Sequence, residues 1–201
     1  MSAFLGPIHY WLYNKIQIQQ KLVEDIIGLG KQNNLDLQKE LDEQFGISET
    51  RALEEVIDQT NIHAWLQNCV SQVENKLAYS ITKLLEKDSN LFHDLQVIFQ
   101  NKGQVVAITE HTDNAAVVFK AIGDSLLDGM PCDHANSIVE ESEEQVIWRR
   151  NNCVHKQYWK AVNGNIENYY KLRDSFINGF LQETPMEFIK IDEETYQIRR
   201  K

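Results

Sequence analysis

Two short Cys-x-His pairs are the residues of this sequence whose types and spacing could carry out chemistry. They are Cys132-Asp133-His134 and Cys153-Val154-His155. Thiolate sulfur and imidazole nitrogen are preferred ligands of zinc, and two such pairs complete a tetrahedral Cys₂His₂ set. The segment between the pairs has the pattern of a hairpin, which would bring them together. The sequence therefore predicts a zinc site with four ligands: Cys132, His134, Cys153 and His155.

Cys153 also has an alternative interpretation as a nucleophile. Asn151 or Asn152 could cap a helix of about nine residues expected after Cys153, and a thiol at a helix N-terminus has a lowered pKa. His155, His134 or His111 could then act as the base. This pattern predicts a cysteine hydrolase as the alternative to a binding site.

Aromatic residues gather in the C-terminal third of the chain, where they could line a ligand pocket or fill a core. Ordinary burial favours the core for Trp148 and Tyr169. Tyr158, Trp159 and Tyr170 stay open as candidates for binding a small molecule. The adjacent Arg149 and Arg150 are candidates for binding an anionic ligand or for offsetting the acidic turn at 140–144.

Charge and cysteine content limit the partners and the compartment. The formal net charge of −10 disfavours nucleic acid and anionic lipid as partners. No apolar run approaches the roughly 20 residues that span a bilayer, and the N-terminal residues lack a basic leader. The three cysteines have no disulfide-framework spacing. We expect a cytoplasmic protein.

The first half of the chain has the pattern of helices. Apolar residues at helical spacing predict a helix over 7–29 that Gly28 and Gly30 end. A second apolar stripe on this helix, which includes Trp11 and Ile18, predicts packing against several neighbours or a homodimer partner. The clearest helical pattern runs from Ile62 to Leu84.

The pattern changes in the second half of the chain. The β-branched segment Gln104–Thr109 predicts a short strand after a helix that Gly103 ends. Two hairpins follow, the first at 137–148 and the second at 186–200. The sequence predicts an α+β fold: a mostly helical region over 1–100, then a region over 104–201 with a small antiparallel sheet of two hairpins covered by helices. The two regions could also form a single domain.

The layout of residues 104–200 resembles the aminothiazoline carboxylate hydrolase family and related small-molecule-binding domains. The strand Gln145–Arg150 leads to Cys153, an intervening helix, the segment Tyr170–Asp174 and a final hairpin. The resemblance implies a nucleophilic role for Cys153 and a polar partner role for Asp174. The final hairpin lacks the Gly-Asp and the cysteine of that family, and the helix lacks its second cysteine.

Three functions follow from these patterns. The first is a binding protein with a metal or small-molecule site near the two Cys-x-His pairs. The second is a cysteine-nucleophile hydrolase, and the third is a non-catalytic protein that forms a homodimer through helix 7–29.

Overall fold

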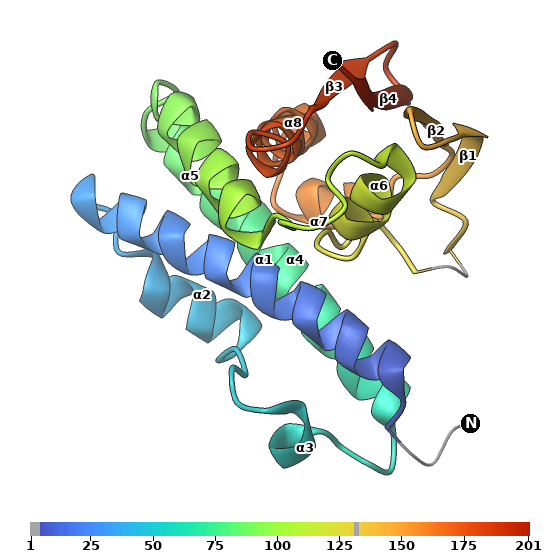
Figure 1. Cartoon of the computed structure of the whole chain (residues 1–201). Coiled ribbons are helices and arrows are strands. Elements are labelled where there is room, and N and C mark those ends of the chain that lie inside the picture. The colour runs from blue at the N-terminus through green and yellow to red at the C-terminus, as the bar shows by residue number, and fades with distance from the viewer. Residues whose placement is uncertain (1–4, 131–132) are drawn as a thin grey trace. The chain divides into compact units, whose positions relative to one another are not determined.

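The computed structural model describes residues 5–130 and 133–201, which form eight helices and a four-stranded antiparallel sheet (Figure 1). The predicted α+β fold, with a helical N-terminal half and a small sheet, is confirmed. The elements are α1 (Pro7–Gln32), α2 (Leu37–Phe45), α3 (Leu53–Val56), α4 (Ile62–Lys87), α5 (Leu91–Val106), α6 (Ala115–Gly123), β1 (Asn136–Glu141), β2 (Gln145–Arg150), α7 (Lys156–Ala161), α8 (Ile166–Phe180), β3 (Met186–Lys190) and β4 (Thr195–Arg200).

The chain divides into two compact units. Unit 1 contains Met1–Phe92 and Tyr158–Asn165, and unit 2 contains His93–Gln157 and Ile166–Lys201. Each unit is therefore built from two separate stretches of sequence. None of the described helices has the length and apolar character needed to cross a membrane.

Unit 1 is organised by two long helices, α1 and α4, which pack side by side in parallel (Figure 1). The first turns of α1 and α4 are in contact, because the rings of His9 and His63 lie 5.3 Å apart. Beyond the C-terminal end of α1, the Asn34 carbonyl accepts a hydrogen bond from Lys87 at the end of α4. Apolar side chains on the facing stripes are removed from solvent, and this burial supplies most of the stabilisation.

Helix α1 ends at Gln32, so the prediction that it ends near residue 29 is wrong. Gly28 and Gly30 both lie within the helix. Gly30 is buried, and a Cβ there would meet the Leu35 carbonyl oxygen at 3.0 Å, so the chain needs the small size of glycine for the turn into α2. Trp11 and Ile18 are half-buried, and the homodimer through this helix stays a prediction.

A buried ion pair anchors α2 to α4 in unit 1. The Lys76 ammonium, whose side chain is 2% exposed, donates to Asp42 at 3.0 Å and to the Ser48 hydroxyl at 2.9 Å. Removing one partner of such a pair leaves a poorly solvated charge.

We therefore expect Lys76→Ala to lower the free energy of unfolding by about 2–3 kcal/mol, because Asp42 keeps some contact with water. Chemical denaturation would measure the change. The control is Lys83→Ala, which breaks the exposed Lys83–Glu86 pair and should cost less than about 1 kcal/mol. Equal losses in the two variants would contradict the expectation.

Unit 2 contains the sheet, in the order β1-β2-β4-β3, with α6 and α8 packed against it (Figure 1). Both predicted hairpins are present, as β1–β2 and β3–β4. Alternation along the strands places Val146 and Trp148 of β2 opposite Ile198 and Tyr196 of β4 on a buried face. Phe119 of α6 packs against Trp148, with ring centroids 4.9 Å apart.

Helices α5 and α8 approach each other closely at two glycines. A Cβ at Gly103 would overlap the Phe176 carbonyl oxygen, and a Cβ at Gly179 would overlap the Gln100 carbonyl oxygen. Gly103 is therefore a contact residue, and α5 continues through it to Val106. The predicted strand over Gln104–Thr109 is wrong, because its first three residues complete the helix and the rest have no regular structure.

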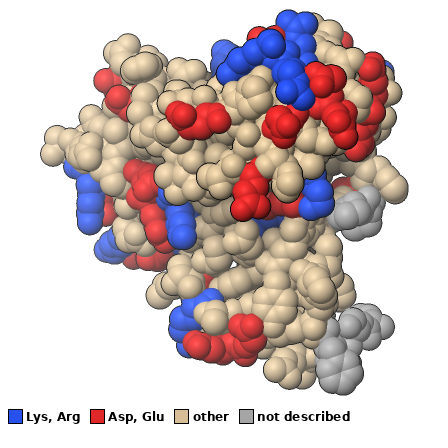
Figure 2. Space-filling view, in the orientation of Figure 1, with Lys and Arg blue, Asp and Glu red and all other residues tan. Residues whose placement is uncertain are grey.

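Acidic and basic side chains are interspersed on the face shown in Figure 2. Three exposed arginines of the sheet each pair with a carboxylate. The pairs are Arg149–Glu194 at 3.1 Å, Arg199–Glu187 at 2.7 Å and Arg200–Glu144 at 2.8 Å. These arginines are thus locally neutralised.

Candidate functional site

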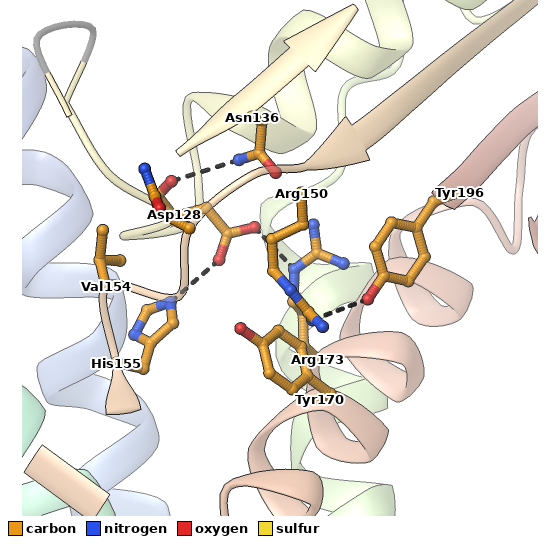
Figure 3. Close-up of a pocket in the computed structure, with 9 residues that line it drawn as sticks. Asp128, Asn136, Arg150, Val154, His155, Tyr170, Arg173 and Tyr196 are labelled. Carbon is orange, nitrogen blue, oxygen red and sulfur yellow. Dashed lines mark hydrogen bonds and ion pairs between the residues drawn. The ribbon is translucent and has the colours of Figure 1, made fainter. Parts of the chain in front are cut away.

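The carboxylate of Asp128 is the centre of a mostly buried polar cluster in unit 2 (Figure 3). It accepts hydrogen bonds from the Tyr169 hydroxyl at 2.9 Å and from Arg173 Nε at 2.6 Å. His155 Nε2 lies 3.2 Å from Asp128 Oδ1, the same oxygen that accepts from Tyr169. His155 and Arg173 are nearly fully buried, at 2% and 5% exposed, and the Asp128 side chain is 18% exposed.

Three elements bring this cluster together. Asp128 lies in the segment between α6 and β1, and His155 lies just before α7. Tyr169 and Arg173 are four residues apart on α8, a spacing that puts both side chains on one face of the helix. Asn136, at the start of β1, donates to the Asp128 carbonyl at 3.3 Å and fixes the backbone of this segment.

Charge pairing decides the ionisation of the cluster. Burial alone would raise the pKa of Asp128, but Arg173 and His155 outweigh it and hold that pKa well below its usual range. Burial likewise disfavours the charged form of Arg173, and Asp128 more than compensates, so the Arg173 pKa lies above its usual value. Asp128 and Arg173 therefore form a buried ion pair.

A second arginine reaches the same region from the end of β2. The Arg150 guanidinium lies over the ring of Tyr170, 3.8 Å from its centroid (Figure 3). It donates to the Tyr196 hydroxyl at 2.9 Å and to the Glu193 carbonyl at 3.0 Å. Both acceptors are neutral, so Arg150 differs from the carboxylate-paired arginines of the exposed sheet.

These side chains line a small cavity that is partly open to solvent, because Asn136 and Asn152 in its lining are exposed. Its volume for the centres of water-sized molecules is about 10 Å³, which is room for one water or one atomic ion. Nη1 of Arg173 is buried and makes no hydrogen bond within the described part of the chain. The cavity is lined by Asp128, Asn136, Arg150, Asn152, Val154, His155, Tyr170, Arg173 and Tyr196.

No family model, curated protein or solved structure matches this chain. What the site can do therefore has to be inferred from its own geometry. The resemblance to the aminothiazoline carboxylate hydrolase family stays a prediction.

The three residues proposed for catalysis, Cys153, His155 and Asp174, all lie in unit 2 and contact different groups, and their catalytic role stays a prediction. His155 contacts Asp128, whereas Cys153 lies in the loop before α7 and faces the Tyr170 hydroxyl. Burial and then Cys153 raise the pKa of Tyr170, so this phenol stays protonated. Asp174 lies on α8, and burial raises its pKa. Its Oδ1 has no hydrogen-bond partner among the described residues.

The prediction that Asn151 or Asn152 caps a helix of about nine residues after Cys153 is wrong. Helix α7 begins at Lys156 and has six residues, not nine. The Asn151 side chain instead donates to the His134 carbonyl and accepts from Ser137, which ties the loop before β1 to the end of β2. Cys153 therefore lies before the first residue of α7 and not at the helix N-terminus.

The predicted zinc ligands are placed only in part, because Cys132 lies outside the described residues. His134 is exposed and has a left-handed backbone (φ 47°). The nitrogen Nε2 of His155 faces Asp128 rather than an open coordination position. Over residues 5–130 and 133–201, no group of three or more His, Cys, Asp or Glu side chains is arranged to hold a metal ion. The zinc site stays a prediction.

Of the three aromatic residues proposed to bind a small molecule, only Tyr170 lines the cavity. Tyr158 and Trp159 belong to unit 1. The Tyr158 hydroxyl lies 3.3 Å from the Ser71 hydroxyl of α4, and Trp159 is 1% exposed. Trp159 is thus a core residue.

Sequence reasoning missed Asp128 and Arg173. Asp128-Gly129 has the pattern of a helix ending, and Arg173 follows one turn after two tyrosines in an otherwise amphipathic helix. The one available signal was a charged residue on the apolar face of α8. Arg150 was identified as a candidate for anion binding.

Proposed function

We propose that this protein binds a small anion in the cavity of unit 2, with Arg150, Tyr170 and Arg173 as the binding residues. The observation that carries the proposal is the buried Nη1 of Arg173, an N–H donor of a residue that lines the cavity, which no described residue satisfies. Leaving such a donor unpaired costs about 1–3 kcal/mol, and an acceptor in the cavity would remove that cost.

The charge of the lining supports an anion over a water molecule. Asp128 balances Arg173, whereas the hydrogen bonds of Arg150 go to neutral oxygen atoms, so its positive charge is offset through space by Asp174 and not by a hydrogen-bonded carboxylate. A water molecule would satisfy the Arg173 donor without balancing this charge, whereas an anion does both. The protonated Tyr170 hydroxyl adds a third donor.

The experiment is thermal unfolding in a panel of sodium salts at constant ionic strength, with Arg150→Gln compared with Arg149→Gln. Arg149 is the matched control, because it is the neighbouring residue, carries the same charge and pairs with Glu194 outside the cavity. We expect wild type and Arg149→Gln to show a saturable rise in Tm with at least one anion, as mass action requires.

Arg150→Gln should lose at least tenfold in apparent affinity for that anion. A saturable rise that is equal in all three proteins, or absent from all three, would overturn the proposed function.

A further inference from the structure

The cavity of unit 2 is open to solvent on the side of two asparagines. Asn136 and Asn152 are the exposed members of its lining. Tyr170 and Arg173, in the same lining, are only 6% and 5% exposed. A ligand can therefore place an anionic group against the buried residues and extend past the asparagines into solvent. The opening does not limit the size of the ligand, but its side chains can select the group that lies next to the anion.

Two buried donors belong to residues that line the cavity and have no hydrogen-bond partner in the described part of the chain. They are Nη1 of Arg173 and the Tyr170 hydroxyl. Their residues are three apart on α8, so both side chains lie on one face of the helix. Arg150 already donates from both terminal nitrogens, to the Tyr196 hydroxyl and the Glu193 carbonyl. Two free donors match the two oxygens of a carboxylate, whereas a phosphate group would leave a third oxygen without one.

The side chain of Asn152 can recognise the group next to that carboxylate. Its backbone is held by a hydrogen bond from its N–H to the Ala135 carbonyl at 3.2 Å, and no described residue bonds to its side-chain amide. An asparagine amide presents an N–H donor beside a carbonyl acceptor, and a secondary amide offers the complementary pair. Asn136 cannot make both bonds in this way, because its amide nitrogen donates to the Asp128 carbonyl (Figure 3).

The geometry points to a carboxylate that carries a secondary amide on its α-carbon as the ligand of this cavity. N-acylated amino acids and the C-terminal residue of a peptide share this unit. The inference rests on the proposed function, since it names the class of anion for the same site. The carboxylate accepts from Arg173 Nη1 and the Tyr170 hydroxyl beside the positive charge of Arg150, and the amide pairs with Asn152 at the opening. All four residues line one small space, so a single ligand reaches them together.

The test is isothermal titration calorimetry with N-acetylglycine and two matched compounds. Pentanoate has the same chain length and carboxylate but no amide, and N-acetylglycinamide keeps the amide but has no charge. We expect wild type to bind N-acetylglycine at least tenfold more tightly than pentanoate, because the amide adds two hydrogen bonds. N-acetylglycinamide should bind more weakly than either carboxylate, because it lacks the charge that the arginines recognise.

Variants assign these differences to residues. Asn152→Ala should lower the affinity for N-acetylglycine to that for pentanoate and leave the affinity for pentanoate unchanged. Asn101→Ala is the matched control, because Asn101 is exposed on α5 and does not line the cavity. Arg150→Gln should lose at least tenfold in affinity for both carboxylates, and Arg149→Gln for neither. Circular dichroism would establish that each variant is folded.

The outcomes separate this inference from the proposed function. If wild type binds N-acetylglycine and pentanoate equally, or if Asn152→Ala keeps the preference, the inference is overturned, and Arg150-dependent binding of both carboxylates leaves the proposed function standing. If no carboxylate binds while one salt gives an Arg150-dependent rise in Tm, the inference alone is again overturned. If neither is observed, both are overturned.

A longer ligand distinguishes the two sources of this chemistry. Acetyl-triglycine carries the same terminal unit as N-acetylglycine on a longer chain. Equal affinity for the two compounds identifies a free N-acylated amino acid, and at least threefold tighter binding of acetyl-triglycine identifies a peptide C-terminus. Either result supports the inference, and acetyl-triglycine that binds no more tightly than pentanoate would overturn it for peptides.

Discussion

Replacing Asp128 with Asn is expected to lower the free energy of unfolding by about 3–5 kcal/mol. The substitution keeps the shape of the side chain but leaves the Arg173 guanidinium, which is 5% exposed, without its counter-charge. His155 and Tyr169 also lose a charged acceptor. Denaturant titration at neutral pH would measure the loss.

The dependence on pH gives this prediction a second readout. Because the folded-state pKa of Asp128 is lowered, its stabilising contribution is fully present above the pKa of an unfolded aspartate, about 3.9, and decreases as the pH falls below that value. The difference in stability between wild type and Asp128→Asn should therefore narrow below about pH 4. A difference that widens there would contradict the assignment of Asp128 as the ionised partner.

Asp124→Asn is the control for this substitution. Asp124 pairs with Lys120 at 2.6 Å on the surface, where its side chain is 37% exposed. Exposed pairs contribute little, so we expect a loss below about 1 kcal/mol.

Gly179→Ala is expected to lower the free energy of unfolding by an amount similar to that of Asp128→Asn, but the cause is steric overlap. The added methyl group would overlap the Gln100 carbonyl oxygen, so α5 and α8 would have to separate. Overpacking of this kind, against backbone rather than a flexible side chain, should cost at least about 3 kcal/mol. Thermal unfolding and denaturant titration would both detect it.

Gly28→Ala, a substitution in α1, is expected to raise the free energy of unfolding. Gly28 lies inside α1, and a Cβ there meets no atom within 4 Å. Alanine is the better helix former, so this variant should gain about 0.5–1 kcal/mol. If Gly179→Ala were as stable as Gly28→Ala, the close contact of α5 and α8 would be wrong.

The fold could be predicted from the sequence wherever apolar residues kept one spacing, either helical or alternating, along a whole helix or strand. The apolar repeat from Ile62 to Leu84 identified α4, and two alternating runs around an acidic turn identified each hairpin. The errors came from glycine, whose role depends on what packs against it. Gly103 and Gly30 looked like helix ends, yet each lies where another part of the chain comes close. Local propensity does not encode such contacts.

The candidate site was predictable only in part, for the same reason. His155 and Tyr170 drew attention by their residue types, and Arg150 by its charge. Asp128 and Arg173 are separated by 45 residues along the chain and become partners only when α8 packs beside the segment after α6. No spacing in one dimension indicates that contact.

The division of the chain also has a consequence for the order in which the protein can fold during synthesis. Tyr158–Asn165 belongs to unit 1, which otherwise ends at Phe92. Gly164 sits against Thr82 of α4 and the Trp159 ring, so α4 completes its packing only after these late residues have left the ribosome. A nascent chain of the first 92 residues must therefore wait, with part of α4 uncovered, for about 70 more residues, or several seconds at 5–20 residues per second.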